Sequence, residues 1–446
     1  MRTREKRVQD AAGPLDWSLL SGAVPAVITV LGAAALLGLC FSRRRSWWWL
    51  WGPVALLVSA ALAWLIVIAV DDWWQPFPDG LPRTSAVWIG VALLGVVLAL
   101  FRIPALRWRG RLATVVAALL VVVLSAAQIN KEFAEYPTLR AAPGPWQAKV
   151  GTLAGGDQNK VPTVDVPAGQ ALDQVWNPPA NLPAQGTLSR ADIPGTLSHF
   201  AARQAYVYLP PAYQANPRPL LPVLVLTAGQ PGSPDDWITA GQLVSVMDKF
   251  ASEHRGLAPV VAVVDPLGSQ FANTLCMDSK IAKVQTYLAK DVPAWVDSHL
   301  QTGTGRKAWS IGGLSFGGTC ALQLAVNAPQ VYGSFLDISG QNEPTLGSRS
   351  QTVNEAFGGD SAAFAAVNPL DVLKHTRFPD TAGALVVGSG DSTYAPQQRE
   401  VLAACRQAGM TTTWLELPGG HSWEVWRPGL VDELPWLAEQ TGLIKG

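Results

Sequence analysis

Four apolar segments within the first 130 residues constrain the fold of this 446-residue chain more than any other feature. They cover residues 19–41, 47–70, 86–101 and 112–129, and a helix needs about 20 apolar residues to cross a bilayer. No polar face recurs in them at helical spacing, which argues against a soluble helical bundle. A cleaved signal peptide would not be followed by three more such segments. The sequence therefore predicts a transmembrane domain of four helices over residues 1–130.

Arginines in the short loops predict the orientation of these helices, because cytoplasmic loops carry an excess of Lys and Arg. The first and third loops carry seven of them: Arg43, Arg44, Arg45, Arg102, Arg107, Arg109 and Arg111. The second loop carries three aspartates against one arginine. The N-terminal tail favours the opposite orientation, because it holds Arg2, Arg4, Lys6 and Arg7. We follow the two loops that agree, and expect a multi-pass cell-membrane protein whose C-terminal part is extracytoplasmic.

The remaining chain divides into a linker and a globular domain. Residues 131–185 are rich in Pro, Gly, Ala, Gln and Asn, which predicts a linker. From 186 to 446, predicted strands (206–209, 222–227, 258–264, 307–311, 333–338, 384–387 and 411–417) alternate with predicted helices (242–253, 283–300, 319–327, 395–408 and 429–440). Such alternation indicates a mostly parallel sheet with helices on both faces. The formal net charge of zero argues against a nucleic-acid partner.

A sharp turn between one predicted strand and the next helix carries a candidate nucleophile. The turn reads Gly313-Leu314-Ser315-Phe316-Gly317, and Gly-x-Ser-x-Gly between a strand and a helix is typical of the nucleophile elbow of an α/β-hydrolase. The tight turn strains the serine and lifts its hydroxyl clear of the sheet. Ser315 then stands at a helix N-terminus, where free N–H groups can stabilise an oxyanion.

A serine nucleophile needs a base and an acid, which follow it along the chain in this fold. Of five histidines, His421 is the candidate base, because it lies on a glycine-containing loop between the last predicted strand and the last helix. Asp391 follows the strand before that and is the favoured acid, while Asp337 is its competitor. The oxyanion would be held by the backbone N–H groups of Phe316 and Gln230, since Pro231 has no N–H.

The cysteines predict neither a metal site nor a cofactor. Cys40 lies in an apolar segment, and Cys276, Cys320 and Cys405 lie in the globular part with no zinc-ribbon or CxxC spacing. Two interpretations remain open for these three residues. Either Cys276 and Cys320 form a disulfide in an extracytoplasmic domain, or all three are buried thiols.

Residues 186–446 resemble the esterase family of the α/β-hydrolases, which includes esterase D-like enzymes, feruloyl esterases and mycobacterial mycolyltransferases. The matching stretches are Tyr208–Tyr213, Asp235–Trp237, Gly313–Gly318, Gly388–Asp391 and Gly419–Trp423 with Trp426. Four spans followed by this domain resemble membrane-anchored esterases of actinobacteria. Two features depart from the family pattern. Ala228-Gly229 stands where His-Gly is common, and Asp391 stands where the mycolyltransferases have glutamate.

These features lead to one main hypothesis and two alternatives. The main hypothesis is a membrane-anchored serine esterase with the triad Ser315, His421 and Asp391. Because the enzyme would lie near a bilayer, esters of membrane lipids or aminoacyl lipids are its natural substrates. One alternative is an acyltransferase that passes the acyl group to a sugar or lipid hydroxyl. The other is an inactive lipid-binding or scaffold module, against which the intact Ser, Asp and His set argues.

Overall fold

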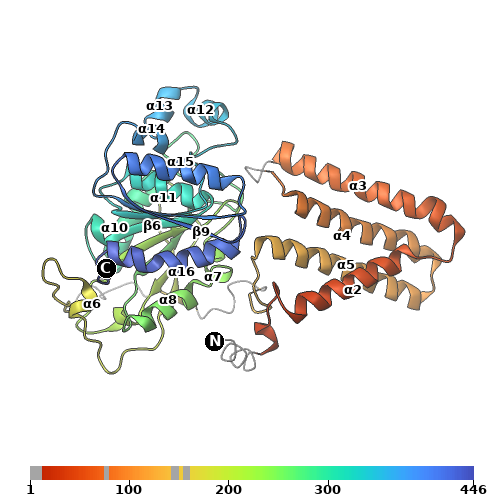
Figure 1. Cartoon of the computed structure of the whole chain (residues 1–446), viewed down its shortest axis with the longest axis horizontal. Coiled ribbons are helices and arrows are strands. Elements are labelled where there is room, and N and C mark those ends of the chain that lie inside the picture. Colours follow the sequence, from red (N-terminus) through yellow and green to blue (C-terminus); the bar gives the residue numbers. More distant parts are fainter. Residues whose placement is uncertain (1–12, 75–79, 142–149, 154–160) are drawn as a thin grey trace. The chain divides into compact units, whose positions relative to one another are not determined.

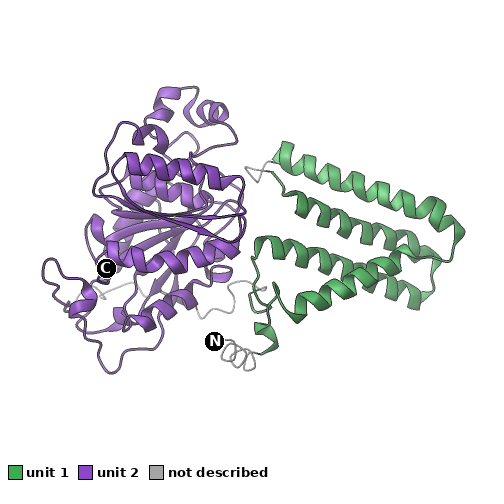
Figure 2. Ribbon diagram, in the orientation of Figure 1, with its two compact units in different colours: residues 1–144 green, residues 145–446 purple. Residues whose placement is uncertain are grey.

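The computed structural model describes residues 13–74, 80–141, 150–153 and 161–446. These residues form two compact units, residues 1–144 and 145–446 (Figure 2). The basic N-terminal tail and Asp79, which entered the orientation argument, lie outside the described residues.

Among its described residues, the first unit contains four helices that are long and apolar enough to cross a membrane, the number that the sequence predicts. Their bounds, after a short turn η1 (Pro14–Asp16), are α2 (Ala23–Cys40), then η2 (Trp47–Trp51), α3 (Gly52–Ile68) and η3 (Ala69–Trp74) as one continuous helix, α4 (Arg83–Arg102) followed by η4 (Ile103–Ala105), and α5 (Trp108–Phe133). Helix α4 extends the apolar segment 86–101 at both ends, because it begins at Arg83 and ends at Arg102.

Helix α5 packs against α2 and α4, and α3 packs against α4. The closest approach uses a small residue, as is common between membrane helices. A Cβ atom on Gly32 of α2 would lie 2.4 Å from the Cβ of Leu124 on α5, so only glycine fits there without movement. At the C-terminal end of α5, the Ser85 hydroxyl of α4 donates to Glu132 at 2.7 Å.

The arginine loops meet at one end of this bundle. The Arg102 guanidinium donates to the carbonyls of Leu39 and Phe41, at 2.9 and 3.0 Å, and so caps the C-terminus of α2. Arg44 of the first loop donates to the Ala105 carbonyl of the third at 3.2 Å. The Trp47 side chain is 3% exposed, because it packs beneath the Arg102 guanidinium and donates its indole N–H to the Cys40 carbonyl.

The second unit is built on a nine-stranded sheet in the order β1-β2-β3-β5-β4-β6-β7-β8-β9. Its strands are β1 (Val150–Thr152), β2 (Thr187–Ala191), β3 (Ala205–Leu209), β4 (Val223–Thr227), β5 (Val260–Val264), β6 (Trp309–Leu314), β7 (Ser334–Ile338), β8 (Ala382–Gly388) and β9 (Thr411–Leu417). Strands β5, β4 and β6 to β9 run parallel, and β3 is antiparallel to both β2 and β5. The mostly parallel sheet is therefore as predicted.

Helices cover both faces of the sheet, with α11 and α15 on one face and α8 and α16 on the other (Figure 1). The helical elements of this unit are α6 (Leu172–Val175), η7 (Pro211–Gln214), α7 (Asp235–Thr239), α8 (Leu243–Glu253), α9 (Val284–Thr286), η8 (Tyr287–Asp291), α10 (Val292–His299), η9 (Arg306–Ala308), α11 (Phe316–Asn327), α12 (Arg349–Phe357), α13 (Ser361–Ala365), α14 (Pro369–Leu373), α15 (Tyr394–Gln407) and α16 (Trp423–Gln440). Strands β3 to β9 correspond to the predicted strands. The central strands β4 to β8 are buried along their whole length and form the core.

Several elements were not predicted. Strand β2 is short and polar, and α12 to α14 form an insertion between β7 and β8. The segment predicted as a linker, residues 131–185, includes the end of α5, strand β1 and helix α6. Helix α16 begins at Trp423, ahead of the predicted start at Gly429, because the Ser422 side chain caps its first turn.

Candidate active site

Ser315 lies between β6 and α11 in a strained backbone conformation, with φ 52° and ψ −121°. The turn is tight enough that a Cβ atom on Gly317 would stand 2.4 Å from the Thr227 carbonyl oxygen. The Ser315 amide donates to the Ile338 carbonyl at 2.8 Å, which fixes the turn to the end of β7. The residue is only 8% exposed. This is the geometry expected of a nucleophile elbow.

His421 lies between Ser315 and Asp391. Its Nε2 is 2.9 Å from the Ser315 Oγ, and its Nδ1 is 2.8 Å from the Asp391 Oδ2. The Asp391 side chain is 3% exposed and that of His421 is 27% exposed. The two loops are joined because the Gly390 amide donates to the Gly419 carbonyl at 2.8 Å. The structure thus brings together three residues that the sequence singled out.

Two aromatic residues that the sequence analysis did not single out for the site hold the imidazole. The Tyr394 ring stacks on His421 with centroids 4.0 Å apart, and Trp426 packs edge-on at 5.0 Å. Tyr394 also donates its backbone N–H to the Asp391 Oδ1 at 3.0 Å. Their spacing could have marked them, because Tyr394 follows Asp391 by three residues and Trp426 follows Trp423 by three on the same helix.

Asp337, the competing acid, lies elsewhere. Its carboxylate accepts from the Gly340 amide and from the Gln398 side chain, both at 2.9 Å. It is fully buried, and burial raises its pKa to about 7. Asp337 therefore belongs to the packing between β7 and α15, while Asp391 contacts the imidazole.

Gln230, one of the two predicted oxyanion donors, lies on the loop after β4, which comprises residues 228–232. This loop approaches Ser315 closely. A Cβ atom on Gly229 would be 3.3 Å from the Ser315 Cβ. Phe316 is the first residue of α11, so its N–H is one of the helix N-terminal groups that have no partner within the helix. The two predicted oxyanion donors, Phe316 and Gln230, thus belong to segments that flank Ser315.

Asp236 fixes the far end of this loop. Its carboxylate accepts from the Ser233 amide at 2.8 Å and from the Ser233 hydroxyl at 3.2 Å. Burial raises the pKa of Asp236 to about 6. The Trp237 indole donates to the Thr227 carbonyl at 3.0 Å, so α7 is held against the end of β4.

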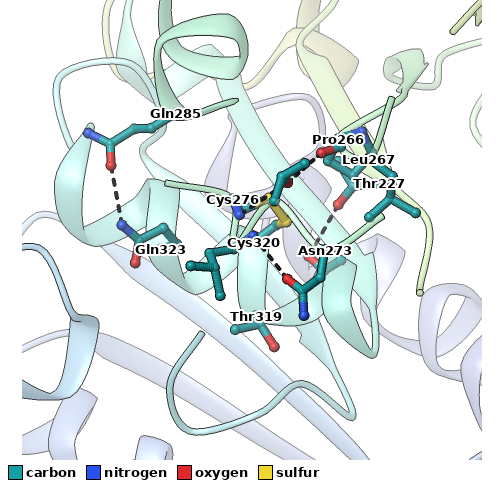
Figure 3. Close-up of a disulfide and its surroundings, with 12 residues drawn as sticks. Thr227, Pro266, Leu267, Asn273, Cys276, Gln285, Thr319, Cys320 and Gln323 are labelled. Atoms are coloured by element: carbon teal, nitrogen blue, oxygen red, sulfur yellow. Dashed lines mark hydrogen bonds between the residues drawn. A yellow bond between two sulfur atoms is a disulfide. The ribbon is translucent and has the colours of Figure 1, made fainter. Parts of the chain in front are cut away.

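A disulfide joins Cys276 to Cys320, which decides between the two interpretations of the cysteines (Figure 3). Cys320 lies on α11, one helical turn after Phe316, and Cys276 lies in the segment after β5. Cys405 is a buried free thiol. The bond therefore connects the helix that follows Ser315 to the segment that follows β5.

Other histidines and possible metal ligands add no second site among the described residues. His254 and His299 stack on Phe250 and Trp295 and bond to backbone carbonyls, so they are structural. Within the described ranges, no group of three or more His, Cys, Asp or Glu side chains could hold a metal ion. A hydroxyl bonded to an imidazole that is bonded in turn to a buried carboxylate can lose its proton to the imidazole and attack a carbonyl carbon.

Comparison with known proteins gives the following matches. Residues 201–437 match the model of a family named Esterase, with the description "Putative esterase". An uncharacterized protein of Corynebacterium glutamicum is 40% identical over 440 residues, which cover 95% of this chain and 97% of that protein.

Two solved structures that cover more than half of this chain are similar to it. A structure described as a ferulic acid esterase is 17% identical, covers 57% of this chain and 98% of its own, and has a TM-score of 0.50. An S-formylglutathione hydrolase from Agrobacterium tumefaciens is 20% identical, with coverage of 58% and 98% and a TM-score of 0.49. The family match and the first of these structures identify the α/β-hydrolase fold.

Proposed function

Because the chain belongs to this esterase family and has an α/β-hydrolase fold, we propose that it is a membrane-anchored serine esterase acting on carboxylic esters. The observation that carries the proposal is the position of His421, 2.9 Å from the Ser315 hydroxyl and 2.8 Å from the Asp391 carboxylate. No step requires a metal or an organic cofactor in this proposal.

The proposed reaction proceeds through an acyl-enzyme. The Ser315 Oγ forms a bond to the ester carbonyl carbon while its proton moves to the His421 Nε2. The tetrahedral oxyanion accepts hydrogen bonds from the Phe316 and Gln230 amides, each of which contributes on the order of 3 kcal/mol. The ester C–O bond then breaks, and the imidazolium returns the proton to the leaving alcohol. Water then attacks the carbonyl carbon of the acyl-enzyme and gives a proton to the His421 Nε2. The bond to the Ser315 Oγ breaks, the imidazolium returns the proton to that oxygen, and the free acid leaves. Asp391 orients the imidazole in both halves of the reaction.

The substrate class follows from the anchor. Four helices that can cross a membrane would confine the hydrolase unit near lipid head groups, so acyl glycolipids and aminoacyl phospholipids are the proposed substrates. A test is lipid profiling of a deletion strain complemented with the wild type or with Ser315→Ala. We expect one ester lipid to accumulate equally in the deletion strain and in the Ser315→Ala strain, and to return to its normal level with the wild type.

The purified full-length protein should then release the acyl or aminoacyl group from the lipid that accumulates. Adding trehalose or another alcohol tests the acyltransferase alternative, because transfer yields a new ester in place of a free acid. Unchanged lipids in the strains, together with no ester cleavage by the purified protein, would contradict the proposal.

We also propose that the hydrolase unit is extracytoplasmic. The arginine loops lie at one end of the bundle, and α5 leads into the hydrolase unit from its opposite end. The Cys276–Cys320 disulfide supports the same orientation, because structural disulfides persist in oxidising compartments. Protease added to intact spheroplasts should therefore cleave the hydrolase unit, while a tag inserted in the loop between α2 and η2 should be cleaved only after lysis. The reverse pattern would contradict this orientation.

A further inference from the structure

One loop contacts both segments that carry the proposed oxyanion donors. We call it the bracing loop and define it as residues 265–277, which follow β5. Its first part is fixed by Asp265, whose carboxylate accepts from the Leu267 and Gly268 amides at 3.0 Å each. The Thr274 hydroxyl donates back to the Pro266 carbonyl at 2.7 Å, which closes the loop on itself.

The bracing loop holds the 228–232 loop through its backbone. The Gly232 amide donates to the Gln270 carbonyl at 3.0 Å, and the Gln230 side-chain amide donates to the Phe271 carbonyl at 3.1 Å. Arg203 provides a third connection, because it pairs with Asp265 at 2.7 Å and donates to the Gly232 carbonyl at 2.8 Å. The position of the Gln230 backbone N–H, the proposed oxyanion donor, thus depends on the position of the bracing loop.

The disulfide ties the same loop to the nucleophile helix. Cys276 is bonded to Cys320 of α11, one turn beyond Phe316 (Figure 3). Leu275 and Cys276 both have left-handed backbone conformations, with φ of 61° and 52°. Residues with side chains adopt such conformations only where the surroundings hold them. The covalent bond is one such constraint at the end of the loop.

We propose that the Cys276–Cys320 disulfide is a positioning element of the oxyanion site, which sets the spacing between the Phe316 amide on α11 and the Gln230 amide on the 228–232 loop. The inference rests on the proposed function, because only acyl transfer develops an oxyanion there. Donors on two separate segments stabilise the transition state only if they are held in place before the reaction. The bracing loop links these segments, and the disulfide completes the link.

The hydrolase unit should fold without this bond. Leu275 and Met277, on either side of Cys276, are buried against Val353, Ala356 and Phe364 of the helical insertion. These apolar contacts keep the end of the bracing loop near its place when the sulfur–sulfur bond is absent. Loss of the disulfide is therefore expected to loosen the spacing of the two amides rather than unfold the unit.

The test compares full-length wild type, Cys276→Ala/Cys320→Ala and Cys405→Ala in detergent, well below their thermal midpoints. Cys405→Ala is the matched control, because it removes a buried thiol that takes no part in the disulfide. We measure kcat and KM for p-nitrophenyl butyrate and the rate of covalent labelling by a fluorophosphonate probe. The double variant should lose at least ~10-fold in kcat and in labelling rate. This loss is smaller than that caused by removing an oxyanion donor outright, because the two amides remain but are less well held. KM should change by less than about twofold, since ground-state binding is retained.

Reduction gives an independent comparison on the wild-type chain. A phosphine reductant should lower kcat of the wild type to the level of the double variant, reoxidation should restore it, and the double variant should not respond. A merely stabilising disulfide would lower the thermal midpoint and leave kcat and the labelling rate unchanged, which would overturn the proposal. If the wild type reacts with the probe but cleaves no ester, the esterase function is contradicted. The ratio of the labelling rates of the wild type and the double variant would still test the positioning role of the disulfide.

Discussion

Replacing Ser315 with alanine is expected to lower ester turnover by at least ~10⁴-fold, as removal of the nucleophile does in such constellations. The variant keeps the fold, because the backbone N–H of residue 315 still bonds to the Ile338 carbonyl and the substitution removes only the hydroxyl oxygen, with the alanine methyl group in the place of the serine Cβ. His421→Ala should reduce kcat by a similar factor, since the hydroxyl then has no acceptor for its proton. Steady-state kinetics with a chromogenic ester and labelling by a fluorophosphonate probe measure both effects.

Two variants control for the loss of a buried serine and of a stacked histidine. Ser310→Ala removes a buried hydroxyl near the start of the same strand, where it bonds to Ser334 at 2.6 Å. His299→Ala removes a ring stacked on Trp295. Both should keep kcat within about twofold, because surface and structural changes away from a site act mainly on stability. Substantial ester turnover by Ser315→Ala would show that another group is the nucleophile.

The second large effect is expected at Asp391. Asp391→Asn should lower kcat by about 10³- to 10⁴-fold at neutral pH, because an amide in place of the carboxylate favours the wrong imidazole tautomer and does not stabilise the imidazolium. Asp337→Asn should leave kcat within about threefold, because Asp337 bonds to Gly340 and Gln398 and not to the imidazole. Parallel measurement of kcat for the two variants decides between the acids. A far larger loss at Asp337 would mean that the acid is misassigned.

Asp337 should instead appear in the pH dependence of stability. Its pKa of about 7 in the folded protein is raised by burial above the ordinary value near 4, so the folded state retains a proton that the unfolded state loses. Stability therefore falls as pH rises from about 4 to about 7 and levels off above that. Gln398 and Cys405 of α15 face this carboxyl, and Cys405 is a thiol whose own raised pKa keeps it neutral in this range. The thermal midpoint of full-length Asp337→Asn should vary less with pH across this window than that of the wild type.

Much of the fold was predictable because its signals are local. Hydropathy marks four helices, and a helix in a bilayer satisfies its own backbone hydrogen bonds, so no distant contact is needed to specify it. The buried parallel strands read as short continuous apolar runs. Strand β2 and helices α12 to α14 lacked such signals, because they are short, partly polar and stabilised by packing against other elements.

The turn at Ser315 was equally predictable, since its tight backbone leaves no room for a side chain at Gly313 or Gly317. The order of serine, acid and histidine along the chain then narrowed the partners to His421 and two aspartates. Asp337 and Asp391 each lie at or just beyond the end of a buried strand, so the sequence favoured Asp391 but left Asp337 as a competitor.

The sequence by itself therefore determined the four long apolar helices, the parallel sheet and the sharp turn at Ser315, because each depends on a pattern within one segment. Only the tertiary structure decided which carboxylate meets the imidazole, because that depends on the hydrogen bond between the Gly390 and Gly419 loops. It likewise decided that Cys276 pairs with Cys320, and that Tyr394 and Trp426 enclose His421. Contacts between residues distant along the chain arise from how strands and helices pack, and no local pattern encodes them.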